Sequence, residues 1–132
     1  MILFGSYYYK IMGEYMDVLK KAKNLAKCLS DKKAIDIVLL DVRGKSDITD
    51  FFVLATGTTN IHINALSMYA KHCMQDLELP SLRREGIARE SRWSVTDFGS
   101  IILHIFTQDI RAEYDLENVI EDASEIDWEA DT

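Results

Sequence analysis

The sequence contains a single proline, Pro80, and only two cysteines, Cys28 and Cys73, which lie far apart. No apolar run approaches the ~20 residues that a membrane-spanning helix needs. The opening residues, MILFGSYYYK, lack the basic start of a secretion signal and the Arg/Ser-rich composition of an organelle transit peptide. We therefore expect a cytoplasmic protein without a membrane segment, in which both cysteines are reduced, unpaired thiols.

Metal ligands and positive charge are also scarce. The three histidines do not cluster with the cysteines, whereas a zinc site needs about four ligands. We therefore expect neither a metal site nor a cofactor. The formal net charge is −7, and nine acidic residues but no basic residue follow Arg111. Because phosphate contacts require lysine and arginine, this balance argues against nucleic acid as the main partner and favours a basic protein.

The chain does have enough apolar side chains for one core, since 48% of its 132 residues are hydrophobic. Apolar residues at helical spacing predict helices over 17–29 and 60–77, and the second ends before Pro80. Two apolar runs rich in β-branched residues, 34–42 and 48–57, predict buried strands.

The stretch WSVTDFGSIILHIF, from Trp93 to Phe106, predicts a β-hairpin, because two alternating apolar runs flank a short break that contains aspartate and glycine. Residues 107–123 predict a last helix, with Thr107 or Asp109 as its N-cap. The fold class is therefore α/β, a single domain with a mixed β-sheet flanked by helices.

Two motifs suggest enzymes. Asp97-Phe98-Gly99 matches the magnesium-binding triplet of protein kinases, but the chain has neither a glycine-rich phosphate loop nor a His-Arg-Asp catalytic loop. ATGTTN, at 55–60, is a strand-to-helix turn of the kind that binds phosphate. Nucleotidyltransferases then need two carboxylates on the following strand, and here only Asp47 and Asp50, at a strand entry, offer a pair. We predict no catalytic residues, and keep an enzyme acting on a nucleotide as the alternative.

Three ring-bearing residues of the hairpin are candidates for partner contact. His104 alternates within an apolar strand, which suits either a packed histidine or a contact residue. Trp93 lies on an alternating strand, where core and interface are both plausible. Phe98 falls at the bend, where we expect the least burial, and an exposed aromatic ring is typical of binding hot spots. These residues therefore indicate docking rather than catalysis.

Long parts of the chain resemble the Iojap-like ribosomal silencing factors. The segment KKAIDIVLLDVRGKSDITDFFVLATGTTNIHINAL is similar to the opening signature of that family. The hairpin sequence and RAEYDLE resemble its Trp-strand-Asp-x-Gly hairpin and closing helix. The match runs in order from about Met16 to Glu117, with departures at Thr59, Ile61 and Ser100.

The resemblance implies a nucleotidyltransferase-like fold without catalytic residues. It also implies a function, namely binding of the large ribosomal subunit through its ribosomal protein fourteen. The bound factor blocks subunit association and represses translation when nutrients are scarce. By position, Trp93 and Phe98 correspond to docking residues, Asp97 and Gly99 shape the turn, and His104 lies on the return strand. A homodimer is one state open to the free protein.

The same resemblance sets the expected domain limits. The family-like domain is expected to span residues 16–119. Residues 1–15 precede it and are interpreted as a leader, either an extension or an overcalled start, since Met12 and Met16 are later start sites. Residues 120–132 are interpreted as an acidic C-terminal tail that contributes little to binding.

Overall fold

The computed structural model describes residues 2–87, 92–118 and 123–130. The helices are α1 (Ile2–Asp31), α2 (Asn60–Asp76) and α3 (Gln108–Tyr114), and a 3-10 turn follows at Leu116–Asn118. The strands are β1 (Ile35–Asp41), β2 (Phe51–Thr56), β3 (Arg83–Ile87), β4 (Trp93–Asp97), β5 (Ile101–Phe106) and β6 (Ser124–Ile126).

The strands form one mixed sheet in the order β3-β4-β5-β2-β1-β6. β2 and β5 run parallel, whereas the other neighbours pair antiparallel. The predicted α/β fold with a mixed sheet is confirmed. The predicted hairpin is also confirmed and consists of β4 and β5, and the two strands and the helix predicted before it correspond to β1, β2 and α2. The sequence also predicts a strand between the second helix and the hairpin, without a residue range, and β3 occupies this place. Its range was not predicted, because its exposed residues, Arg83, Arg84 and Glu85, give a polar edge strand without an apolar alternation.

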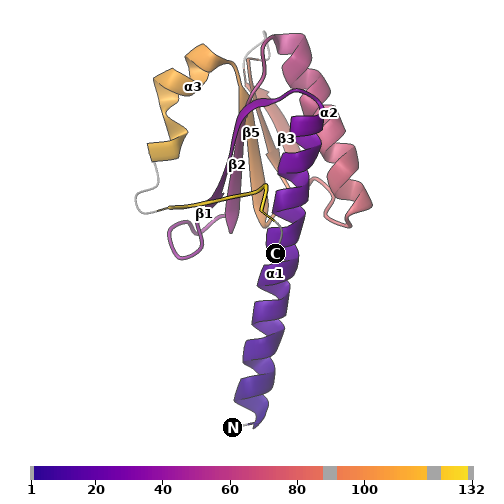
Figure 1. The fold of residues 1–132 in the computed structure, drawn as a ribbon, viewed down its shortest axis with the longest axis vertical. Coiled ribbons are helices and arrows are strands. Elements are labelled where there is room, and N and C mark those ends of the chain that lie inside the picture. The colour runs from indigo at the N-terminus through magenta and orange to yellow at the C-terminus, as the bar shows by residue number, and fades with distance from the viewer. Residues whose placement is uncertain (1, 88–91, 119–122, 131–132) are drawn as a thin grey trace.

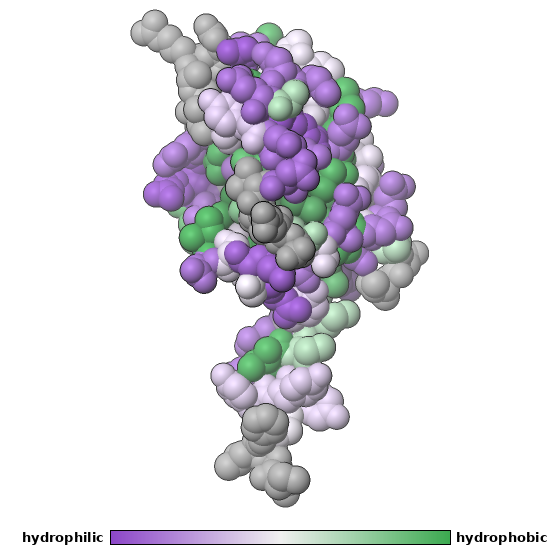
Figure 2. All heavy atoms as spheres, turned by 90° about the vertical axis from the view of Figure 1, so that its left-hand side faces the viewer, coloured by the Kyte–Doolittle hydropathy of each residue, from purple (hydrophilic) through white to green (hydrophobic). Residues whose placement is uncertain are grey.

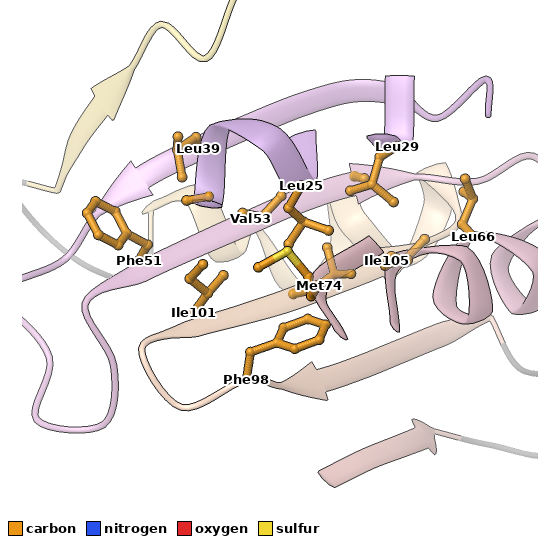
Figure 3. Packing of buried hydrophobic residues seen from close by; sticks show 14 of the residues in the cluster. Leu25, Leu29, Leu39, Phe51, Val53, Leu66, Met74, Phe98, Ile101 and Ile105 are labelled. Atoms are coloured by element: carbon orange, nitrogen blue, oxygen red, sulfur yellow. The ribbon is translucent and has the colours of Figure 1, made fainter. Parts of the chain in front are cut away.

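Helices α1 and α2 cover one face of the sheet, and α3 lies on the other side (Figure 1). The main core forms between the sheet and the first two helices, where Leu25, Leu29, Leu66 and Met74 meet the inward side chains of the central strands (Figure 3). Every one of these four side chains is fully buried. Burial of apolar area on this scale is the main stabilising term of a single domain.

Helix α1 is much longer than the predicted helix over 17–29, since it continues back to Ile2 through the expected leader. Its N-terminal part extends beyond the sheet (Figure 1) and exposes the side chains of Tyr7, Tyr8 and Tyr9. Tyr15 is the point where the helix reaches the domain. Its ring stacks on Phe51 at 5.6 Å, and its hydroxyl donates to Asp41 Oδ2 at 2.9 Å.

Helix α3 is shorter than the predicted helix over 107–123, of which residues 119–122 lie outside the described part of the chain. It ends at Tyr114 because Asp115 adopts the left-handed conformation, with φ of 48°. Arg111 fixes the helix to the sheet, since its guanidinium donates to Thr56 Oγ1 at 2.9 Å, to the Asp36 carbonyl at 2.7 Å and to Glu117 Oε1 at 2.7 Å. This buried arginine therefore holds α3 against the sheet face opposite α1 and α2.

The described part of the expected acidic tail does not extend into solvent. Residues 124–126 pair with β1 as the edge strand β6. Trp128 packs against the main core, and its Nε1 donates to the Ile37 carbonyl at 3.0 Å. The C-terminal segment is therefore part of the packed domain.

The expectation of two unpaired thiols is wrong in this structure. Cys28 on α1 and Cys73 on α2 form a disulfide, with their Cα atoms 6.9 Å apart. Sequence spacing gave no sign of this pair, because only the packing of the two helices brings the cysteines together. Among the residues that the structure describes, none of the helices combines the length and apolar composition needed to cross a bilayer.

Candidate functional site

Phe98 is not exposed at the hairpin bend, contrary to our expectation. Only 2% of its surface is accessible, and its ring lies in the main core near Met74 (Figure 3). Side chains of β4 alternate between the two faces, so Ser94 and Thr96 point to the helices and Phe98 continues their side. Helix α2 supplies the cover that a bend normally lacks. A direct docking role for Phe98 is therefore not supported by its position.

Asp97 and Gly99 do form the turn. Gly99 has a positive φ of 86°, which favours glycine, and its N–H donates to Asp97 Oδ1 at 2.7 Å. Phe98 N–H donates to the Ile101 carbonyl at 2.8 Å and closes the bend. The Asp-Phe-Gly triplet thus builds a compact turn that directs its phenylalanine inward.

Trp93 and His104 lie together on the opposite face of the hairpin. Trp93 Nε1 donates to His104 Nδ1 at 3.1 Å, and their rings are 6.0 Å apart. Since the indole N–H can only donate, the neutral imidazole accepts at Nδ1 and carries its proton on Nε2. Burial lowers the pKa of His104 from 6.5 to about 4. The histidine is therefore neutral at physiological pH.

An apolar hollow of about 510 Å³ opens on this face beside His104, below the part that α3 covers. Its floor comes from alternating residues of three adjacent strands, and the loop before β2 and the 3-10 turn close its sides. The apolar lining is Ile48, Phe52, Leu54, Val95, Ile102 and Leu116. Figure 2 looks onto this side, where apolar side chains are visible between hydrophilic ones. We call this hollow the open groove.

The rim of the open groove carries charges of both signs. Lys45 and Arg83 contribute positive charge, whereas Glu85 and Asp97 contribute negative charge. Arg83 Nε and Glu85 Oε1 are 3.6 Å apart, so part of this charge is paired on the exposed edge strand. An apolar floor with a polar rim is the usual anatomy of a protein-docking surface.

The Gly57 turn, the candidate nucleotide site, lies elsewhere. Thr59 caps α2 by accepting from His62 N–H at 3.0 Å, and a Cβ at Gly57 would lie only 2.7 Å from Ile63 Cγ1. Asp47 and Asp50 precede β2, whereas Gly57 follows it, and at about 3.3 Å per residue the strand separates them by roughly 20 Å. Within the described ranges, no group of three or more His, Cys, Asp or Glu side chains could hold a metal ion.

Three of the five predicted contact residues, Trp93, Asp97 and His104, therefore lie on one face, while Phe98 points away from it and Gly99 serves the turn. Sequence reasoning missed the residues that make up most of the groove, above all Phe52 and Val95. Part of the signal was in the sequence, since Val95 alternates in register with Trp93. The place of Phe52 beside them was not, because it depends on the pairing of β5 with both β2 and β4.

Comparison with known proteins identifies the family. The sequence profile described as "Ribosomal silencing factor during starvation" matches residues 15–132. The chain is 34% identical over 101 residues to the ribosomal silencing factor RsfS of Halalkalibacterium halodurans, covering 76% of this chain and 86% of that protein. It is also 34% identical over 118 residues to the chloroplastic protein Iojap of Zea mays, covering 88% of this chain and 50% of the maize protein.

Solved structures agree with these sequence matches. A crystal structure of a Bacillus halodurans protein is similar with a TM-score of 0.66 and 31% identity, covering 78% of this chain and 93% of that chain. A Chromobacterium violaceum protein shares the fold with a TM-score of 0.71 at 24% identity, covering 76% and 82% of the two chains. The profile extends beyond the expected domain limit at 119 and includes β6 and Trp128. The chain belongs to the ribosomal silencing factor family.

Proposed function

We propose that this protein binds the large ribosomal subunit through ribosomal protein fourteen and blocks its association with the small subunit. Translation is thereby repressed when nutrients are scarce. The observation that carries the proposal is the open groove, an apolar hollow on the sheet face that carries Trp93 and His104. The protein would act in the cytoplasm, where it meets free large subunits.

The composition of the groove supports docking to a protein. Phe52 is partly exposed, and its ring meets His104 at 5.6 Å, so the floor offers aromatic surface that is held in place by neighbouring strands. Rigid aromatic residues lose little conformational entropy on binding and are enriched at hot spots. The excess of acidic residues would attract a basic ribosomal protein over longer distances.

The same surface suggests what the free protein does with its groove. An apolar patch left in contact with water favours association with another surface. A second copy would cover it in the absence of ribosomes, which gives the homodimer named above as one state open to the free protein. Docking to the large subunit would then compete with self-association.

A regulatory factor rather than an enzyme agrees with the names of the relatives, which are ribosomal silencing factors. The position of Asp47 and Asp50 supports this view, because the only candidate carboxylate pair lies at the wrong end of β2 for the Gly57 turn. We therefore assign the Gly57 turn a structural role in joining β2 to α2.

Sedimentation with separated ribosomal subunits tests the proposal. We expect the protein to travel with large subunits, to be absent from small subunits, and to lower the yield of joined ribosomes when it is added before the small subunit. Binding to neither subunit, or binding without any effect on joining, would reject the proposed function. Free protein run alone in the same experiment reports its self-association.

A further inference from the structure

Tyr114 extends the aromatic surface of the open groove onto α3. Half of its surface is exposed, at 50%, although its ring lies 4.8 Å from the ring of Trp93 at an angle of 52°. Trp93 in turn donates to His104, which lines the groove. Tyr114 is therefore the outer end of a continuous row of rings.

The surroundings of Tyr114 are negatively charged. Glu113 and Asp115, its neighbours in the chain, are both exposed. Asp115 accepts from Asn118 Nδ2 at 3.0 and 2.9 Å, and within the described parts of the chain neither carboxylate forms an ion pair. Glu117 differs, since it is bound by Arg111 at 2.7 Å. An exposed ring edged by two unneutralised carboxylates is a favourable environment for a cation.

We propose that Tyr114, backed by Trp93, receives a lysine or arginine side chain of the basic protein that docks in the open groove. The inference rests on the proposed function and names the chemistry of the contact at one edge of the same surface. The ring face attracts the cation through its quadrupole, and the carboxylates of Glu113 and Asp115 add charge attraction. Those carboxylates also disfavour an RNA phosphate at this position, so the contact is made by protein.

Two substitutions of Tyr114 test this contact, because one keeps the aromatic ring and the other keeps only an apolar side chain. Tyr114→Phe keeps a ring that stacks on Trp93 and binds a cation, so the affinity for large subunits should stay within about twofold. Tyr114→Leu keeps apolar volume but has no π face, and should weaken binding about three- to tenfold. Tyr8→Leu is the matched control, since Tyr8 is 55% exposed on the far end of α1, and its affinity should equal that of the wild type.

Thermal unfolding of each variant accompanies the binding measurement. If Tyr114→Leu melts markedly earlier than the wild type, Glu113→Lys is measured in its place. Glu113 is exposed, so this substitution keeps the rings of Tyr114 and Trp93. The added positive charge should repel the cation and weaken binding by a similar factor. Normal affinity of folded Tyr114→Leu, or of Glu113→Lys, overturns the cation contact.

Two outcomes distinguish this inference from the proposed function. If Val95→Arg in the groove abolishes binding while Tyr114→Leu binds normally, the surface is correct and Tyr114 has no part in it. If the wild-type protein does not travel with large subunits, both the function and the contact are rejected.

Discussion

At the scale of single residues, Phe98 and Trp93 show what local sequence can and cannot predict. Both were considered as aromatic anchors on one hairpin, yet Phe98 is buried and Trp93 is half-buried on the other face. Alternation along β4 separates them, because 93, 95 and 97 share one face whereas 94, 96 and 98 share the other. Helix α2 covers Phe98, and the sequence of the hairpin alone does not indicate where α2 lies.

His104 is the residue whose chemistry depends most on its surroundings. It pairs with Val95 across the hairpin, accepts from Trp93 and contacts the ring of Phe52. From the alternation of its strand alone, His104 suits either a packed histidine or a contact residue. It is both packed and part of the groove lining, because its ring contacts Trp93 and Phe52 while part of its side chain faces the groove.

We predict that His104 makes folding sensitive to acid. The unfolded chain binds a proton at this residue near pH 6.5, whereas the folded protein binds it only near pH 4. The unfolded state therefore holds more protons between these values, and stability is lost as pH falls from 6.5 towards 4, by up to about 1.4 kcal/mol per pH unit. His104→Asn keeps an acceptor for Trp93 but does not titrate.

Urea unfolding of both proteins at several pH values measures this effect. The wild type should be more stable than His104→Asn at pH 7.5, and the difference should shrink steadily towards pH 4.5. A difference that does not change with pH would mean that His104 titrates normally in the folded protein.

At the scale of elements, prediction succeeded where a strand or helix has an apolar pattern of its own. β1, β2, α2 and the hairpin of β4 and β5 each carry such a pattern. The two edge strands, β3 and β6, do not, because each pairs on one side only and exposes most of its side chains. Their pairing is decided by the neighbouring strand rather than by their own sequence.

The C-terminal segment is the element whose interpretation changes most. Its acidic composition suggested a solvated tail, but Trp128 covers part of the core and bonds to the Ile37 carbonyl. Lys23 on α1 also donates to the Ala130 carbonyl at 3.4 Å. One tryptophan in an acidic stretch was the signal that this segment returns to the domain.

We therefore predict that deleting residues 121–132 destabilises the fold. Removing a fully buried tryptophan costs about 3–5 kcal/mol, and for the half-buried Trp128 together with β6 we expect a loss of at least about 2 kcal/mol. A chain that starts at Met12 is the matched control, since residues 6–11 in the part that it loses are all exposed, and its stability should change little. Equal melting temperatures for the deletion and the wild type would contradict the packing of this segment.

At the scale of the whole molecule, the two faces of the sheet differ in how completely they are covered. Among the residues that the structure describes, α1 and α2 cover one face over the main core, whereas α3 covers part of the other face, beside the open groove (Figure 1). The sequence predicted the α/β class and the family, since both depend on patterns along the chain. It did not predict the groove, because a hollow depends on which strands are neighbours and on where α3 ends.

The central claim is that the large subunit docks in the open groove. The most direct test is to measure the affinity of Val95→Arg for large subunits together with its melting temperature. Val95 is half-buried on the groove floor, so a charged side chain there should weaken binding at least about tenfold, in the range of hot-spot substitutions, with little loss of stability. Met68→Arg, at a 46% exposed position of α2 on the helix side, is the matched control and should bind normally. A folded Val95→Arg protein that binds large subunits as tightly as the wild type would contradict the account.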